Sequence, residues 1–266
     1  MKELLILMNC LGEEIIHYLS RVPEITQNFS LKLISTYTNL DNPGILTDVR
    51  TCDILIMNNI KSYEHMTYEH IKKEVKPTCK ICRIEFIRFN GYYPTLPYTY
   101  HGNSLAVYDN STESASFDDY KNYFIAPDTI VSNFNESLVK LRELDELSDI
   151  KFYDFFVSHH KEHALFRDNN HLSAFFIKYI VKQVLLYFDM ETSVNIDALL
   201  LEYCFGHKFR VKPVLDCVKR TLGLTFDTSI VNIFNKDITL EKYYTYIQEV
   251  KTFTSLESCE RHFMKI

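Results

Sequence analysis

The chain has 266 residues, of which 46% are hydrophobic, 24% charged and 14% aromatic. This composition is typical of a folded globular protein and excludes a disordered, collagen-like or coiled-coil chain. Its 29 Lys and Arg residues are outnumbered by 35 Asp and Glu residues, which gives a net charge of -6. An acidic balance argues against general binding to nucleic acid or to an anionic membrane.

The apolar run at the start of the chain, Leu4–Met8, ends at Asn9-Cys10 and superficially resembles a lipoprotein signal. Such a signal needs an apolar core of roughly 7–15 residues and a small residue at the cleavage site. The run Leu4–Met8 is shorter than that, and Asn9 is not a small residue of the required kind. The longest other apolar stretch, Ala174–Met190, contains two lysines. A membrane-spanning helix needs about 20 nearly uncharged residues. We therefore expect a cytoplasmic protein without membrane insertion.

Short apolar runs alternate with helical patterns in the N-terminal third of the chain. Continuous apolar runs are typical of strands buried in a parallel sheet. We expect strands at Leu4–Met8, Leu31–Ile34, Asp53–Met57 and Ile81–Phe89, and helices at Glu13–Leu19 and Tyr63–Glu74. This alternation predicts an α/β fold, with a Rossmann-like or flavodoxin-like parallel sheet and helices on both of its faces.

The rest of the chain has mainly helical patterns, so the C-terminal half is expected to be rich in helix. The expected helices are Ser137–Leu147, Ala174–Phe188, Ile196–Tyr203, Val214–Leu222 and Leu240–Phe253. We expect an α/β catalytic domain over residues 1–190. A helical extension is expected over residues 191–266, either separate or as part of the same domain.

Cys10 stands out among the seven cysteines because it follows a predicted strand and precedes a predicted helix. An odd number of cysteines in a chain of this length indicates reduced thiols and not a disulfide framework. Ligands of open α/β sheets bind at the carboxyl ends of the strands. A helix start favours a thiolate and can hold an oxyanion, and Gly12 would let a substrate approach the backbone. The alternative is a small buried cysteine without chemistry.

A nucleophilic thiol needs a base, and the base needs a group that orients it. The segment Asp168-Asn169-Asn170-His171 offers both, because two residues separate its Asp from its His at a predicted helix start. His171 would take a proton from Cys10, and Asp168 would fix the imidazole tautomer. The alternative is that Asp168 is only an N-cap and His171 a surface residue of the first turn.

Polar residues in two other predicted loops are candidate ligand contacts. Asn58 and Asn59 end the third predicted strand, and Gly102-Asn103 follows His101 in a loop rich in Pro and Tyr. A Gly-Asn pair can donate an amide to a developing oxyanion, or it can form an ordinary β-turn.

A histidine cluster before His171 offers a metal site as an alternative. His159 and His163 are four residues apart, which on a helix places both on one face, at a spacing suited to a divalent ion. The zincin pattern is missing, because His160 and not Glu follows His159. We therefore interpret the cluster as a polar surface turn and predict no metal ligand.

The pair Cys79-x-x-Cys82 is a weak signal for a metal or redox site. It lacks a second cysteine pair and leads into a predicted strand, whereas a redox motif of this kind precedes a helix. We expect all cysteines except Cys10 to serve packing.

Three segments, in this order, resemble the WcbI-type polysaccharide biosynthesis proteins, a family linked to acetyl transfer from coenzyme A during capsule assembly. They are Ile6–Cys10, a strand ending in Asn-Cys; Ile87–Pro94, an aromatic Gly-Tyr-x-Pro turn; and Phe166–His171, an Asp-x-x-His block. The resemblance covers about residues 4–190. The first and last segments are also similar to the corresponding blocks of SGNH-type esterases and acyltransferases, with Cys in place of Ser.

The resemblance implies an acyltransferase that moves acetyl from coenzyme A to a sugar hydroxyl of a capsular or surface polysaccharide, without a metal. Its partners would be acyl-CoA and a saccharide acceptor. Cys10 would be the nucleophile or acyl-positioning thiol, and His171 the base, oriented by Asp168.

The expected contacts to coenzyme A are Asn9, Leu11, Gly12 and Arg88. The expected substrate contacts are Asn58, Asn59, Tyr93, His101, Gly102, Asn103 and Asn170. Three alternatives stay open. They are an SGNH-like esterase or deacetylase, a metal-dependent hydrolase built on His159, His163, Asp168 and His171, and a non-catalytic nucleotide- or sugar-binding module.

Overall fold

The computed structural model describes residues 1–36, 40–42, 44–61, 63–95, 114–199, 212–227, 230–233 and 236–250. The chain forms two compact units. The first comprises Met1–Arg88, Lys140–His159 and Asn170–His207, and the second comprises Phe89–Val139, His160–Asn169 and Lys208–Ile266. The division of the sequence into domains at residue 190 stays a prediction.

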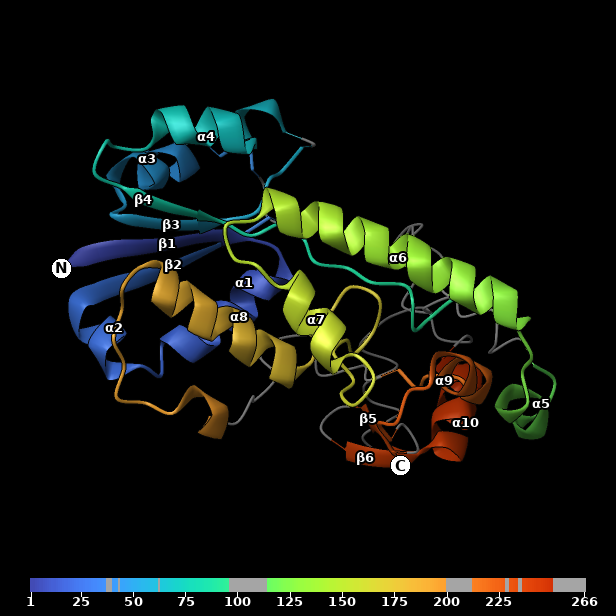
Figure 1. Ribbon diagram of the computed structural model, residues 1–266. Helices are drawn as coiled ribbons and strands as arrows, with labels where there is room; N and C mark the ends of the chain where they lie inside the picture. Colours follow the sequence, from blue (N-terminus) through green and yellow to red (C-terminus); the bar gives the residue numbers. More distant parts are fainter. Residues whose placement is uncertain are drawn as a thin grey trace. The chain divides into compact units, whose positions relative to one another are not determined.

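A four-stranded parallel sheet forms the centre of the first unit (Figure 1). Its strands are β1 (Lys2–Met8), β2 (Phe29–Ser35), β3 (Ile54–Met57) and β4 (Lys80–Arg83), in the order β2-β1-β3-β4. In register, Leu4 lies opposite Leu31 on one side and Ile54 on the other. The order reverses between β1 and β3, as in flavodoxin-like folds, and this confirms the predicted α/β class.

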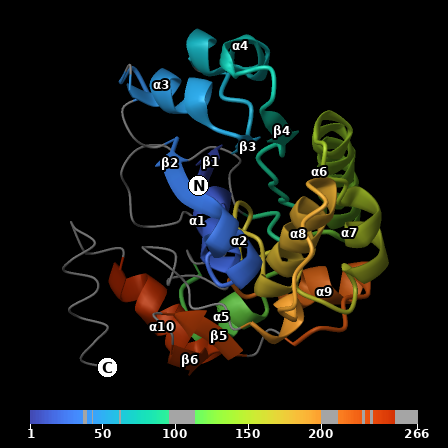
Figure 2. The same cartoon turned by 90° about the vertical axis from the view of Figure 1, so that its left-hand side faces the viewer.

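Helices cover both faces of this sheet (Figures 1 and 2). One face carries α3 (Gly44–Thr51) and α4 (Tyr68–Glu74); the other carries α1 (Cys10–Leu19), α2 (Pro23–Asn28) and α8 (Ala174–Tyr187). Side chains alternate along a strand, so Leu5 and Leu7 join the cluster under α3 and α4. Ile6 and Met8 point to the opposite face and meet α1.

Strand β4 is shorter than the predicted Ile81–Phe89. Its last bond to β3 comes from the Ile84 N–H, which donates to the Met57 carbonyl at 2.9 Å, and the neighbouring backbone groups bond outside the sheet. The Asp149 N–H donates to the Arg83 carbonyl at 2.7 Å, and the Glu85 N–H donates to the Ser148 Oγ at 2.9 Å. Arg88, which lies within the predicted strand, is therefore beyond the observed one.

The second half of the chain is rich in helix, as predicted. Its elements are α5 (Phe117–Lys121), α6 (Pro127–Leu147), α7 (Tyr153–His159), η3 (Ile196–Ala198), α9 (Asp216–Leu222), the hairpin of β5 (Ile230–Ile233) and β6 (Lys236–Thr239), and α10 (Leu240–Val250). In place of the predicted helix Ile196–Tyr203, the structure has only the 3₁₀ turn η3, which ends at the extended Leu199; the remaining predicted residues lie outside the described part. A further 3₁₀ turn, η1 (Glu64–Met66), precedes α4. Across the described ranges, every helix is too short or too polar to span a bilayer.

Aromatic side chains form the core of the second unit. The Phe89 ring centre lies 5.2 Å from that of Tyr92, 5.4 Å from that of Phe134 and 5.5 Å from that of Phe166. A Cβ atom at Gly91 would lie 2.4 Å from the Phe89 Cζ and 2.8 Å from the Phe134 Cδ2, so the chain needs a glycine to pass these rings. The aromatic Gly-Tyr-x-Pro segment is therefore a packing element.

Helix α1 packs closely against the sheet at Gly12. A Cβ atom there would lie 2.7 Å from the Met8 Cβ, 3.0 Å from the Ile6 Cγ2 and 3.1 Å from the Leu33 Cδ1. Glycine lets the helix backbone approach β1 and β2, and this holds the first residues of α1 at the carboxyl end of β1.

We expect Gly12→Ala to lower the free energy of unfolding by about 1–3 kcal/mol, because the methyl group overpacks this contact. Denaturant unfolding followed by circular dichroism measures the loss. Gly44→Ala is the matched control: Gly44 is also in the first turn of a helix, and its Cβ would meet only the Asn42 side chain, at 3.2 Å. Equal stability of the two variants would contradict a tight contact at Gly12.

Candidate functional site

The carboxyl ends of β1 and β3 meet where the strand order reverses. The chain leaves β1 at Asn9 and β3 at Asn58, and the Asn9 N–H donates to the Asn58 Oδ1 at 3.3 Å. The Asn58 N–H in turn donates to the Leu7 carbonyl at 3.3 Å. Both asparagine side chains are buried. Ligands of open α/β sheets bind at such a reversal, so this is the candidate site.

Asn9 is the N-cap of α1. Its Oδ1 accepts from the Leu11 N–H at 3.2 Å, and its carbonyl accepts from the Gly12 N–H at 2.8 Å. Leu11 and Gly12 were expected to contact coenzyme A, and a ligand that used these N–H groups would have to displace the cap. Because the side-chain oxygens of Asn9 and Asn58 already accept hydrogen bonds, each side chain can offer its NH₂ group to a ligand.

Cys10 is the first residue of α1 and is buried, with 3% of its surface exposed. This is the predicted position, directly after a strand and at the start of a helix. Gly12 was expected to let a substrate approach the backbone. In the structure it lets α1 approach β1 and β2, so this glycine has a packing role.

Glu13, one turn after Cys10, interacts electrostatically with His171. The carboxyl group is half-buried; burial raises its pKa, and the nearby His171 charge partly offsets that rise. Residues three apart share a helix face, so Cys10 and Glu13 point to the same side of α1. The structure thus brings His171 to the side of α1 that carries Cys10. Sequence reasoning missed Glu13, although its spacing from Cys10 was a visible signal.

His171 lies just before α8, which packs against α1. The helix begins at Ala174, as predicted, and the Ser173 Oγ caps it by accepting from the Phe176 N–H at 3.4 Å. Asp168 is buried and belongs to the second unit. Its role as the group that orients His171 stays a prediction.

Two further predicted contacts lie in the first unit. The Asn59 Oδ1 accepts from the Tyr68 N–H at 2.9 Å, at the first residue of α4. The Arg88 side chain is exposed, and its guanidinium lies 5.2 Å from the centre of the Phe86 ring. Asn59 is thus engaged in holding α4, whereas Arg88 presents a positive charge at the surface.

The remaining predicted substrate contacts lie in both units or outside the described residues. Tyr93 lies in the second unit, and its hydroxyl donates to the Phe166 carbonyl at 3.1 Å. Asn170 is partly buried and precedes His171 in the first unit. The loop residues His101, Gly102 and Asn103 lie outside the described part of the chain.

The histidines of the metal hypothesis have other contacts. The His159 Nδ1 lies 2.8 Å from the Phe155 carbonyl, and the two rings stack with their centres 4.3 Å apart. His163 is exposed. Among the residues that the structure describes, no three or more His, Cys, Asp or Glu side chains form a group that could hold a metal ion.

Comparison with known proteins identifies relatives of the chain. A sequence model of the polysaccharide biosynthesis enzyme WcbI matches residues 3–193. No curated protein matches the chain significantly. A solved structure of WcbI superposes with a TM-score of 0.71 at 13% identity, covering 99% of this chain and 94% of that one. It is described as the native protein without a disulfide bond between coenzyme A and one of its cysteines.

We expect His171→Asn to raise the pKa of Glu13 further, because the variant removes the positive charge that lowers it. A ¹³C NMR titration of the Glu13 carboxyl carbon measures this pKa. His70→Asn is the matched control, since His70 lies near Glu74 on α4 and is not among the groups that shift Glu13. An unchanged Glu13 pKa in His171→Asn would contradict the proximity of the two residues.

The raised pKa of Glu13 also predicts how stability depends on pH. The folded state holds the Glu13 proton more tightly than the unfolded state, whose ordinary pKa is 4.5. Stability contributed by this group is therefore present below that value and is lost as the pH rises through the higher folded-state pKa. We expect Glu13→Gln to gain stability relative to the wild type over this window, measured by denaturant unfolding at several pH values. If the difference in unfolding free energy between Glu13→Gln and the wild type stayed constant across this pH window, it would contradict the raised pKa of Glu13.

Proposed function

The chain belongs to the WcbI family of polysaccharide biosynthesis enzymes, and from this we propose that it transfers acetyl from coenzyme A to a sugar hydroxyl of a capsular or surface polysaccharide. The observation that carries the proposal is the turn after β1. There a thiol begins a helix, and a carboxyl group on the same helix face interacts with a histidine. The description of the solved WcbI structure, which refers to coenzyme A and a cysteine, supports coenzyme A as the donor.

The acyl donor would bind at the carboxyl ends of β1 and β3, with its thioester carbonyl beside Cys10. The NH₂ groups of Asn9 and Asn58 are the proposed donors to the oxygen that becomes an oxyanion. Both side chains are buried, and hydrogen bonds to a developing charge are strongest where water is excluded. Arg88 is the proposed partner for the phosphate groups of coenzyme A, because its charge is exposed.

His171 is the proposed base, which takes a proton from the attacking group. Proton transfer leaves a positive imidazolium, and a carboxylate beside it stabilises that charge. Glu13 is the candidate for this carboxylate, because its pKa already responds to His171. The sequence alone makes Asp168 the candidate for this carboxylate. Turnover measured in the matched variants Glu13→Gln and Asp168→Asn compares the two candidates.

Two attacking groups fit this scheme. If the Cys10 thiol attacks the thioester, an acyl-enzyme forms and coenzyme A leaves; if the sugar hydroxyl attacks directly, Cys10 only positions the donor. Intact mass spectrometry after mixing with acetyl-CoA in the absence of acceptor separates the two routes, because only the first adds an acetyl group to Cys10. Steady release of coenzyme A without acceptor would indicate a hydrolase.

We expect His171→Ala to lower kcat by about 100- to 10,000-fold, because it removes a general base, while the Kd for coenzyme A changes little. Release of the coenzyme A thiol measures turnover, and calorimetry measures the Kd. His70→Ala, a histidine on the opposite face of the sheet, should keep full activity. Full activity of both His171→Ala and Cys10→Ser would contradict the mechanism.

Binding is tested separately by thermal unfolding with coenzyme A and with acetyl-CoA. A ligand that binds only the native state raises the Tm by mass action. An unchanged Tm at millimolar ligand would contradict coenzyme A as the donor. Binding without turnover would instead favour a non-catalytic module.

A further inference from the structure

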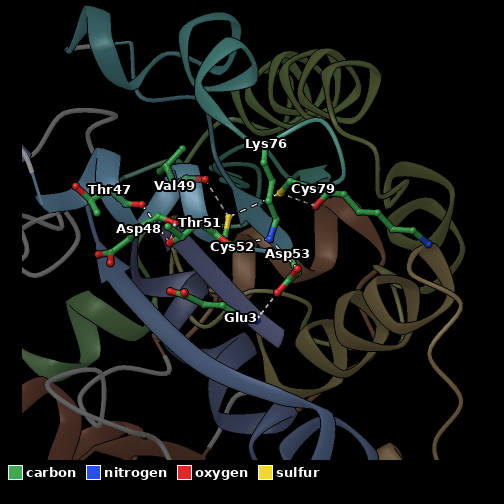
Figure 3. A network of polar contacts seen from close by, with 10 residues as sticks. Glu3, Thr47, Asp48, Val49, Thr51, Cys52, Asp53, Lys76 and Cys79 are labelled. Atoms are coloured by element: carbon green, nitrogen blue, oxygen red, sulfur yellow. Dashed lines mark hydrogen bonds and ion pairs between the residues drawn. The ribbon is translucent and has the colours of Figure 1, made fainter. Parts of the chain in front are cut away.

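A pair of thiols, Cys52 and Cys79, lies at the amino ends of β3 and β4 (Figure 3), whereas Cys10 follows the carboxyl end of β1. Cys52 follows α3 and precedes β3, and Cys79 directly precedes β4. Their Sγ atoms are 3.7 Å apart. Cys52 is fully buried, and Cys79 is partly exposed.

Asp53 and Lys76 hold the chain segments that carry the two cysteines. The Lys76 Nζ donates to the Asp53 Oδ1 at 2.8 Å and to the Thr51 carbonyl at 2.9 Å. The Asp53 Oδ2 accepts from the Glu3 N–H at 2.7 Å, and the Asp53 carbonyl accepts from the Lys80 N–H at 3.0 Å. These bonds fix the backbone next to both cysteines, so the sulfur contact is set by the fold (Figure 3).

The backbone geometry is compatible with a disulfide. Ile54 of β3 lies opposite Lys80 of β4, so Cys79 precedes this pair by one residue and Cys52 precedes it by two. With about 4.8 Å between strands and about 3.3 Å along them, this offset corresponds to Cα atoms about 6 Å apart, and a disulfide needs Cα atoms about 4.4–6.8 Å apart. From their 3.7 Å separation the sulfur atoms must approach by about 1.7 Å to form a bond, which is within the reach of side-chain rotation.

The two thiols differ in reactivity. The hydrogen bond between the two sulfur atoms and the positive charge of Lys76 lower the pKa of Cys79, although its partial burial opposes this. The same hydrogen bond and burial raise the pKa of Cys52. An exposed thiol with a lowered pKa beside a cation is the type that reacts with oxidants. Cys79 is therefore the thiol that would react first.

The sequence motif Cys79-x-x-Cys82 contains Cys79 but does not contain its partner Cys52. Cys82 lies inside β4 and is fully buried, and burial raises the pKa of its thiol. Along a strand, residues three apart point to opposite faces, so Cys82 faces away from Cys79. The partner of Cys79 comes instead from a segment that is distant in the sequence.

We propose that Cys52 and Cys79 form a reversible thiol-oxidation site, in which Cys79 reacts with a hydroperoxide and Cys52 completes an intramolecular disulfide. The Cys79 thiolate attacks an oxygen of the hydroperoxide, the O–O bond breaks, and the leaving oxygen takes a proton to give an alcohol or water. The Cys52 sulfur then attacks the Cys79 sulfenic sulfur, the S–O bond breaks, and the departing hydroxide takes the Cys52 proton as water. Two thiols are oxidised by two electrons, and the peroxide is reduced.

The test treats the full-length protein with hydrogen peroxide, blocks the remaining thiols and maps disulfides by mass spectrometry of the digested chain. We expect a cross-link between the Cys52 and Cys79 peptides that dithiothreitol reverses. In Cys52→Ser, the sulfenic acid on Cys79 should persist and be trapped by dimedone. Lys76→Gln should slow the oxidation by about tenfold, and Lys76→Arg should restore it, because the cation favours the thiolate.

Cys82→Ala is the matched control and should form the same cross-link at the wild-type rate. A Cys79–Cys82 cross-link in the wild type would overturn the proposal. So would peroxide treatment that leaves Cys52 and Cys79 as thiols while oxidising other cysteines. The mapping needs no variant and no acyl-CoA, so its outcome is independent of the proposed transferase activity.

Discussion

The close approach of α1 to β1 and β2 at Gly12 is the constraint on which the candidate site depends. Because Gly12 has no side chain, the first turn of α1 packs directly on β1 and β2. Asn9 then has the position to cap α1 through its side chain and to donate its N–H to Asn58. The same contact makes Cys10 the first residue of the helix. A shift of α1 by the width of a methyl group would move the cap and the thiol together.

The electrostatics of the site arise from two opposed effects on one carboxyl group. Burial makes the charged form of Glu13 costly, and the nearby His171 makes it less so. Such a balance leaves the charges of the two residues dependent on each other, which is typical of groups that exchange protons during catalysis. The buried asparagines supply polar groups whose orientation is already set by the backbone, so they need no reorganisation when charge develops.

The two ends of the strands carry cysteines in two kinds of surroundings. At the carboxyl ends, Cys10 lies at a helix start beside the backbone of α1. At the amino ends, Cys52 and Cys79 lie beside the Asp53–Lys76 ion pair, whose lysine side chain acts on the Cys79 thiol. The sheet keeps these thiols at opposite ends of its strands, so that oxidation of one pair need not consume the thiol proposed for acyl transfer.

Local patterns in the sequence were sufficient for the positions of the four parallel strands, for helices such as α8 and for the place of Cys10 at a strand–helix junction, because apolar runs and such junctions are visible within a few residues. The order of the strands, the electrostatic interaction of Glu13 with His171 and the pairing of Cys52 with Cys79 were decided only by the tertiary structure. Each joins segments that are far apart in the chain, and no local pattern records such a distance. The end of β4 at Arg83 shows the same limit, because edge hydrogen bonds choose among boundaries that the hydrophobic pattern permits equally.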